Sequence, residues 1–216
     1  MKFEVLVADD HAIIRDGLTK ILSDTPDFIV AGQASNGNAA LDMIRQREWA
    51  LVILDISMPG RNGLELIKLI KIERPRVPIF IFSMHHEEQY AVRAIRAGAS
   101  GYLSKETDMD LLLPALRKLV AGGMYISPKV AELLATDVSP NNTALPHASL
   151  TDREFGVFSR IVRGIPMNAI AEELSLSIKT VSTHKSHILA KMHMSNQVEL
   201  VRYALAHHLL DAQSDD

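Results

Sequence analysis

The alternation of short apolar runs with helix-period segments constrains the fold of this chain more than any other feature. The runs have strand length and are rich in Val, Ile and Phe, as strands buried on both faces are. They lie at Phe3–Ala8, Phe28–Ala34, Leu51–Leu54, Pro78–Phe82 and Gly101–Leu103. Segments with apolar residues three or four apart separate or follow them, at Ile13–Leu22, Ala39–Ile44, Leu64–Ile72, Ala91–Gly98 and Leu111–Gly123. This alternation predicts an α/β fold, a doubly wound five-stranded parallel sheet of order 2-1-3-4-5 covered by helices.

The second half of the chain has a different pattern. A short helix is predicted at Pro128–Ala135, and the segment Thr136–Ser149, which has two prolines and no apolar period, indicates an interdomain linker. From Leu150 to about Leu210 the pattern is helical only. We therefore predict an α/β domain, a short helix with linker, an all-α four-helix domain and an acidic tail, at 1–124, 125–148, 149–210 and 211–216.

Composition excludes several classes of protein. The absence of cysteine excludes a disulfide scaffold, a cysteine nucleophile and thiolate metal ligation. No apolar run approaches the roughly 18 residues of a membrane span, and two acids interrupt the N-terminal apolar stretch before a secretory signal could form. We expect a cytoplasmic protein without a membrane partner. The net charge of −3 does not favour nucleic acid, but His147–Leu210 holds 7 Lys and Arg against 5 Asp and Glu.

Acidic residues follow two strands that the predicted order makes neighbours. Asp9 and Asp10 come after the first strand, and Asp55 comes after the third. Ligands of open parallel sheets bind at the carboxyl ends of the strands, where the strand order switches. Carboxylates gathered there repel one another unless a cation or a proton is shared. Because all candidate ligand atoms are oxygens, the sequence predicts Mg²⁺.

Two further residues follow the same logic. Ser83 ends the fourth predicted strand, and Lys105 follows the fifth. A hydroxyl, an ammonium group, carboxylates and a divalent cation suit the transfer of a phosphoryl group to a carboxylate. Individually, an aspartate at a strand end also serves as a helix N-cap, and a lysine as a surface charge. The combination at successive strand ends favours the phosphoryl-transfer site.

The motifs that carry these residues resemble the receiver domain of two-component response regulators, over about 1–121. They are ADDH at Ala8–His11, LDISMPGRNG at Leu54–Gly63, FS at Phe82–Ser83 and GYLSK at Gly101–Lys105. The resemblance implies that Asp55 is the phospho-acceptor and that Mg²⁺ is the cofactor. It further implies that Asp10 binds Mg²⁺ directly, that Asp9 acts mainly through water, and that the Ser57 backbone carbonyl is another ligand. Ser83 and Lys105 would contact the phosphoryl group. Tyr102 would be the aromatic switch.

Two positions depart from the commonest receiver pattern. Met84 stands after the switch hydroxyl, where a small residue is frequent, and its bulk is expected to restrict access of small phosphodonors or water. Glu106 stands after the lysine, where proline is frequent. A cis peptide bond before a residue other than proline costs about 2.5–4 kcal/mol. The geometry of the Lys105–Glu106 peptide therefore stays open.

The helical half contains signals for a helix-turn-helix. Thr151 with Glu154 forms a capping box at a helix start, and Gly164 ends that helix. A short amphipathic helix at Met167–Ser177, a turn, and a third helix at Ser177–Met192 follow. On the third helix we expect a buried stripe at Val181, Ile188 and Met192, which Ile178 extends. Such a unit places its second helix in the DNA major groove.

The ordered set LTDRE, IAEELSLSIKTV, His184 and Lys191 resembles the LuxR-type DNA-binding domain, over about 150–209. Together with a receiver, it resembles response regulators of the NarL/FixJ type. The resemblance implies base contacts from Ser182, Thr183 and Ser186, with Lys185 able to reach base or phosphate. It implies phosphate contacts from Lys179, Thr180 and His187. Gln197 stands where family members often have arginine, which leaves its role open.

Two other features of the helical half have more than one interpretation. His184, His187 and His193 lack cysteine or a nearby carboxylate to complete a zinc ligand set, so we expect no zinc site. The last helix, Asn196–Leu210, has an apolar stripe at Val198, Val201, Ala204 or Leu205, and Leu209. This stripe closes the core of the domain, or pairs with a second subunit, or does both on different faces.

The leading hypothesis is a phosphorylation-controlled transcriptional regulator that binds double-stranded DNA. A sensor histidine kinase transfers phosphate to Asp55, which promotes homodimerisation and promoter binding, and RNA polymerase is a further candidate partner. Its only chemistry is Mg²⁺-dependent self-phosphorylation and self-dephosphorylation, so we do not expect a metabolic enzyme. One rival is a phosphotransfer enzyme or phosphatase, which would have no use for Leu150–Leu210. The other is a constitutive DNA binder, in which Asp55→Asn leaves DNA binding unchanged.

Overall fold

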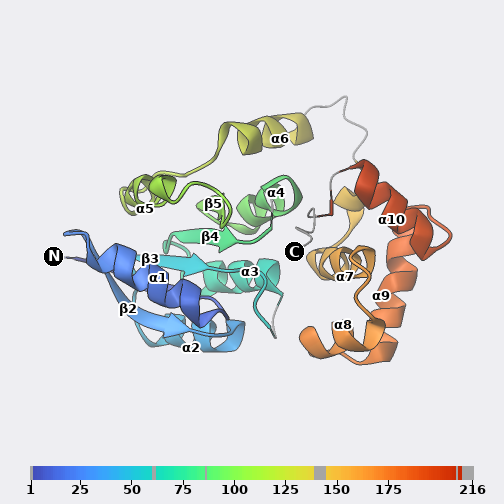
Figure 1. The fold of residues 1–216 in the computed structure, drawn as a ribbon, viewed down its shortest axis with the longest axis horizontal. Helices are drawn as coiled ribbons and strands as arrows, with labels where there is room; N and C mark the ends of the chain where they lie inside the picture. The colour runs from blue at the N-terminus through green and yellow to red at the C-terminus, as the bar shows by residue number, and fades with distance from the viewer. Residues whose placement is uncertain (1, 60–61, 86, 139–144, 208, 211–216) are drawn as a thin grey trace. The chain divides into compact units, whose positions relative to one another are not determined.

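The computed structural model describes residues 2–59, 62–85, 87–138, 145–207 and 209–210 (Figure 1). The chain divides into two compact units, residues 1–130 and residues 131–216.

A five-stranded parallel sheet forms the centre of the first unit. Its strands lie in the order β2-β1-β3-β4-β5, which confirms the predicted fold class. They are β1 (Phe3–Ala8), β2 (Phe28–Ala34), β3 (Leu51–Leu54), β4 (Ile79–Ser83) and β5 (Gly101–Ser104). The predicted bounds of β1, β2 and β3 agree with the structure. The observed β4 begins and ends one residue later than predicted, at Ile79 and Ser83, and β5 ends one residue later, at Ser104.

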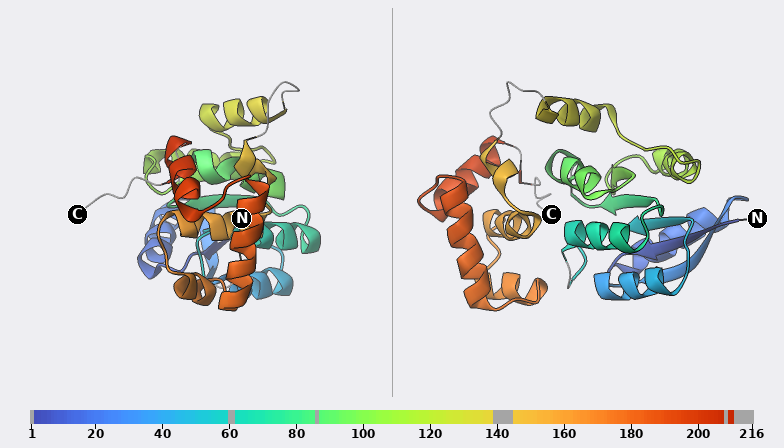
Figure 2. Two further views of the ribbon diagram at one scale, coloured as in Figure 1. Left: turned by 90° about the vertical axis from the view of Figure 1, so that its right-hand side faces the viewer. Right: turned by 180° about the vertical axis from the view of Figure 1, so that it is seen from behind.

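Helices cover both faces of this sheet. One face packs against α1 (Ala12–Ser23) and α5 (Leu112–Val120), and the apolar cluster there includes Val7, Ile53, Phe80 and Leu116. Side chains alternate along each strand, so the other face is apolar as well and includes Leu6, Val52 and Ile81, all fully buried. On this face, α3 (Gly63–Glu73) lies between α2 (Gly37–Gln46) and α4 (Glu87–Ala97), as Figures 1 and 2 show.

The chain after α5 returns to the edge of the sheet. The Tyr125 amide donates to the Ser100 carbonyl at 3.0 Å, and its ring lies edge-on to Phe80. Gly101 permits this approach, because a Cβ there would lie 3.0 Å from the Tyr125 carbonyl oxygen. A 3-10 turn, η1 (Met109–Leu111), precedes α5, and α6 (Pro128–Val138) follows the edge contact.

The second unit is helical in its described residues. Its described part holds the end of α6, from residue 131, and then a 3-10 turn, η2 (Pro146–Ser149). The helices α7 (Asp152–Val162), α8 (Met167–Glu173), α9 (Ile178–Lys191) and α10 (Gln197–Ala206) follow. The predicted capping box of Thr151 and Glu154 is present at the start of α7. The turn between α8 and α9 holds Ser175 at φ 53°, in the left-handed region.

The core of the second unit confirms some predicted positions and corrects others. Val181, Ile188 and Met192 are buried as predicted, but Ile178 is 56% exposed because it lies in the first turn of α9, beyond the core. On α10, Ala204 is buried. Leu209 is buried as well, whereas Val198 and Leu205 are 66% and 60% exposed, so core closure, one of the two roles considered for this stripe, does not extend to these two positions.

Helix length also bears on a membrane location. No helix among the described segments combines the length and the apolarity that crossing a bilayer requires.

Candidate functional site

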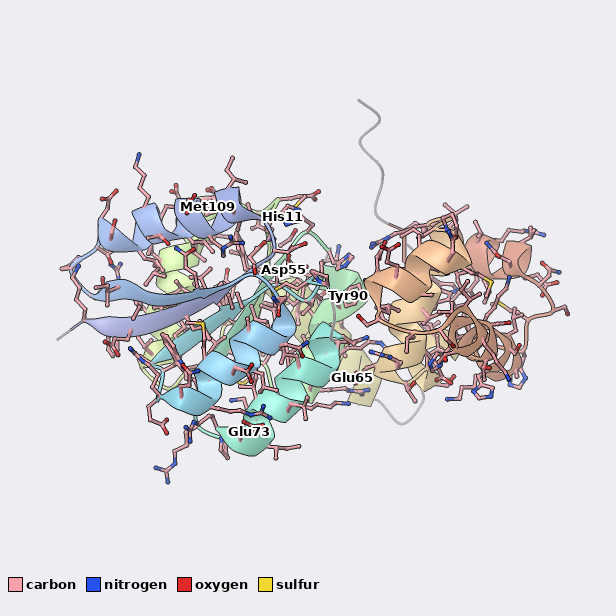
Figure 3. All side chains as sticks on the ribbon, turned by 90° about the horizontal axis from the view of Figure 1, so that it is seen from below. His11, Asp55, Glu65, Glu73, Tyr90 and Met109 are labelled. Atoms are coloured by element: carbon pink, nitrogen blue, oxygen red, sulfur yellow. The ribbon has the colours of Figure 1, made fainter. Side chains whose placement is uncertain are left out.

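The polar residues predicted at the strand ends lie together at one edge of the sheet. The ladder continues one residue past the strands, because the Asp55 amide donates to the Ala8 carbonyl and the Lys105 amide donates to the Ser83 carbonyl, each at 2.8 Å. Figure 3 shows His11 and Asp55 at this edge, whereas Glu73 lies at the opposite end of α3. Parallel strands thus bring four distant segments of sequence to one place.

Lys105 joins two buried carboxylates. Its Nζ lies 2.6 Å from Asp9 Oδ2 and 2.7 Å from Asp55 Oδ2, and the three side chains are 3%, 2% and 1% exposed, respectively. Burial alone lowers the pKa of Lys105 and is the largest single effect, but the combined attraction of Asp55 and Asp9 outweighs it, so the pKa is raised. The ammonium group is therefore held charged between the two acids.

Two hydroxyls lie beside Asp55. The Ser57 amide donates to Asp55 Oδ1 at 2.9 Å, which orients the carboxylate. Ser57 Oγ lies 3.3 Å from Ser83 Oγ, and Ser83 is fully buried. The His85 amide donates to Ser83 Oγ at 3.5 Å. A group bound on Asp55 therefore has hydroxyl and ammonium donors close at hand.

Asp10 and His11 complete the cluster on its open side. Asp10 is 32% exposed, and His11 Nδ1 lies 3.0 Å from Asp10 Oδ1 and 3.3 Å from Asp9 Oδ1. One donor atom from each of Asp9, Asp10, His11 and Asp55 lies within 4.8 Å of the others. Three carboxylates around the Lys105 ammonium leave negative charge in excess, and carboxylate oxygens are ligands that Mg²⁺ prefers. The donor set therefore fits a divalent cation.

The remaining residues singled out in the first unit surround this edge. Tyr102 is 1% exposed, and its hydroxyl donates to the His85 carbonyl at 2.8 Å. The His85 ring stacks on Tyr90 with ring centroids 4.3 Å apart. Met84 is 51% exposed next to buried Ser83. No peptide bond in the described segments is cis, so the Lys105–Glu106 bond is trans.

In the second unit, α9 carries the residues predicted to contact DNA. Of the seven, Lys179, Ser182, Thr183, Ser186 and His187 are exposed, while Thr180 and Lys185 are half-buried. The Thr183 hydroxyl donates to the Lys179 carbonyl at 3.0 Å, and the Ser186 hydroxyl donates to the Ser182 carbonyl at 3.2 Å. These oxygens keep lone pairs directed outward, so they remain able to accept from a ligand.

Two contacts of α9 with the rest of its unit were missed from the sequence. Lys191 Nζ lies 2.7 Å from Glu154 Oε2, which also accepts from the Thr151 amide at 2.8 Å. Lys185 Nζ donates to Gln197 Oε1 at 2.9 Å. The first contact joins the start of α7 to the end of α9, and the second gives Gln197 a structural role.

Comparison with protein families now decides what these two units are. Residues 5–117 match the response regulator receiver domain, and residues 148–204 match the luxR family of bacterial regulatory proteins. The response regulator GacA of Pseudomonas aeruginosa is 34% identical over 98% of this chain and 99% of its own length. The chain is a response regulator of the NarL/FixJ type. The response regulator UvrY of Escherichia coli K12 is 35% identical over 97% of each chain.

Solved structures of other response regulators resemble this chain over nearly its whole length. A structure of RcsB from Salmonella typhimurium has a TM-score of 0.72 and 26% identity, and covers 95% of this chain and 98% of the other. RcsB of Salmonella enterica serovar Typhimurium bound to promoter P1flhDC has a TM-score of 0.69 and 25% identity, with 95% and 100% covered. The response regulator is thus a DNA-binding transcription regulator. The match to the luxR family gives the helical half a function, whereas a phosphotransfer enzyme or phosphatase would not need that half.

His11 is the site residue that the sequence reasoning passed over. It belongs to the ADDH motif, and neither its spacing nor the resemblance predicts a role for it. Its position directly after two acids was the available signal, since the chain turns back there. The His11 amide donates to Asp9 Oδ1 at 2.9 Å, which brings the imidazole over the carboxylates of the response regulator.

Proposed function

We propose that the response regulator is controlled by phosphorylation of Asp55. The observation that carries the proposal is the Lys105 ammonium held within 2.7 Å of Asp9 and Asp55, at the carboxyl ends of parallel strands. A carboxylate paired with lysine and flanked by the Ser83 hydroxyl has the donors that a transferred phosphoryl group needs. The proposed receiver domain is 1–124, linked through 125–148 to a DNA-binding domain at 149–210, with an acidic tail at 211–216.

The chain's own residues have separate roles in the transfer. An Asp55 oxygen attacks phosphorus in the phosphohistidine of a sensor kinase. The P–N bond breaks, and the leaving imidazole keeps the electron pair and takes up a proton. Lys105 stabilises the negative charge on the phosphoryl oxygens, and the Ser83 hydroxyl donates to one of them. Tyr102, buried and bonded to the loop after β4, is proposed as the switch that senses the new position of Ser83.

A divalent cation belongs to this proposal. Asp9, Asp10, Asp55 and the Ser57 carbonyl would hold Mg²⁺, which supplies positive charge against the oxygens of the transferred group. Asp10, whose side chain is the more exposed of the two, would bind the ion directly. Asp9, which is buried, would act mainly through a water molecule.

The DNA-binding part of the proposal rests on α9 and α10. Ser182, Thr183 and Ser186 face bases, Lys179, Thr180 and His187 lie at phosphates, and Lys185 reaches either a base or a phosphate. Val198 and Leu205 are exposed on the same side of α10, about two turns apart, which supports a homodimer contact there. The relative RcsB has been solved on promoter DNA in the presence of the phosphomimetic BeF3⁻. A dimer on two half-sites gains affinity because the second contact is intramolecular. Cytoplasmic location and contact with RNA polymerase complete the proposal.

The test is phosphorylation of the full chain by a small phosphodonor with Mg²⁺. Mass spectrometry should place one phosphoryl group on Asp55, none on Asp55→Asn, and none on Asp10→Ala, which lacks a metal ligand. DNA titrations with sedimentation should then show tighter, two-fold symmetric binding after phosphorylation. Equal labelling of Asp55→Asn contradicts the acceptor assignment. Equal affinity and mass with and without phosphate identify a constitutive DNA binder instead.

A further inference from the structure

The imidazole of His11 is the one polar group of the cluster that the proposed phosphorylation does not use, among the side chains considered above. Its Nδ1 lies 3.0 Å from Asp10 Oδ1 and 3.3 Å from Asp9 Oδ1, and the side chain is 59% exposed. Nitrogen and carboxylate donors of Asp9, Asp10, His11 and Asp55 all lie within 4.8 Å. The His11 imidazole therefore lies at the solvent-exposed side of the proposed cation site, and its exposed side chain can change conformation.

We propose that His11 Nδ1 is a ligand of the divalent cation, and that it makes this receiver bind late first-row ions such as Ni²⁺ more tightly than its carboxylates alone would. The inference rests on the proposed function, because it takes the same cation site as its starting point.

The donor spacing supports direct ligation. In an octahedron with bonds of about 2.1 Å, neighbouring ligand atoms lie about 3.0 Å apart and opposite ones about 4.2 Å. The 3.0 Å between His11 Nδ1 and Asp10 Oδ1 equals the neighbouring distance, and the 4.8 Å limit encloses the opposite one. A cation could therefore take up both atoms with small movements of exposed side chains.

The preference for ion type follows from ligand chemistry. Mg²⁺ prefers oxygen ligands and keeps several waters, so an added imidazole gains it little. Imidazole suits Zn²⁺, Cu²⁺ and Ni²⁺, and affinity for such sites rises along the first row to Cu²⁺. The alternative role for His11 is a hydrogen bond that orients Asp10. In that role Nδ1 carries a proton, and the loss of the imidazole would affect all cations alike.

The experiment uses the untagged full chain and compares wild type with His11→Ala. Calorimetry measures Ni²⁺ and Mg²⁺ affinities, and X-ray absorption of the one-to-one Ni²⁺ complex detects imidazole nitrogen bound to the metal. His193→Asn is the matched control, because it removes another exposed imidazole and asparagine tolerates the positive φ of 55° at that position. Fluorescence of Trp49, buried in the same unit as His11, reports whether His11→Ala is folded, and circular dichroism reports the helices of the unit that holds His193.

We expect His11→Ala to weaken Ni²⁺ binding by about tenfold or more, to change Mg²⁺ binding by less than about twofold, and to abolish the nitrogen signal. His193→Asn should keep the wild-type values. A missing nitrogen signal in the wild type, or equal losses for Ni²⁺ and Mg²⁺, overturns the inference. If Asp55 is still phosphorylated with Mg²⁺ in that case, the proposed function stands and only the role of His11 fails.

Discussion

Replacing Lys105 by methionine should destabilise the receiver unit strongly in the absence of divalent cations. The substitution keeps the length of the side chain but leaves Asp9 and Asp55, 2% and 1% exposed, without their shared partner. Breaking a buried ion pair on one side costs about 3–5 kcal/mol, because the remaining charge is desolvated and uncompensated. With a urea dependence of about 2 kcal/mol/M, the unfolding midpoint should fall by about 1.5–2.5 M.

Tryptophan fluorescence is the assay, because the chain has one tryptophan, Trp49, and it is buried in this unit. Since the pKa of Lys105 is raised above 10.5, its stabilising contribution is complete below that pH and is lost as the pH rises through the higher folded value. The difference between wild type and Lys105→Met should therefore be constant across neutral pH and shrink in strong alkali. Mg²⁺ should restore part of the loss, because it binds the folded carboxylates.

A changed background provides the control. When Asp9 and Asp55 are both replaced by asparagine, Lys105 becomes an unpaired buried charge, so Lys105→Met should then be neutral or stabilising. Equal midpoints for wild type and Lys105→Met, or the same loss in the asparagine background, would refute the electrostatic reasoning.

Three further predictions concern single positions. Burial raises the pKa of Glu154, but bonds from Lys191 and the N-cap outweigh it and lower the pKa, so Glu154→Gln should cost about 1–3 kcal/mol at neutral pH. The difference should begin to shrink below pH 4.5 and be lost once the pH is below the lowered folded pKa, as thermal unfolding followed by circular dichroism will measure. Ser175→Gly should stabilise the turn before α9 by about 0.5–1 kcal/mol, because φ is 53°, and a lower melting temperature would contradict this. Met84→Ala should speed the labelling of Asp55 by a small phosphodonor, and an unchanged rate would remove Met84 as an obstruction.

The sequence predicted what depends on local periodicity and chain order. Apolar runs located the strands within one residue, and the sheet order then placed Asp9, Asp55, Ser83 and Lys105 at one edge without any side-chain information. The prediction of the site succeeded because the carboxyl ends of parallel strands lie at the same side of the sheet, independently of the conformation of the loops.

The missed features depend on contacts that a single sequence does not encode. Lys191 and Glu154 are 37 residues apart and meet only once α7 and α9 have packed. Apolar periodicity also left the environment of Val198 and Leu205 open, because it shows that a face is apolar and does not show what covers it. His11 was missed because a chain reversal, and no repeating pattern, brings its ring over the acids.

The two faces of α9 have a practical consequence for engineering this regulator. Val181 and Ile188 are fully buried and hold the helix in its domain, whereas Ser182, Thr183 and Ser186 are exposed. Substitutions at exposed positions away from special features usually change stability by less than about 0.5 kcal/mol. A library randomised at these three exposed positions should therefore yield mostly folded proteins. Because the same positions are the proposed base contacts, selection from such a library should change the operator preference while the scaffold stays intact.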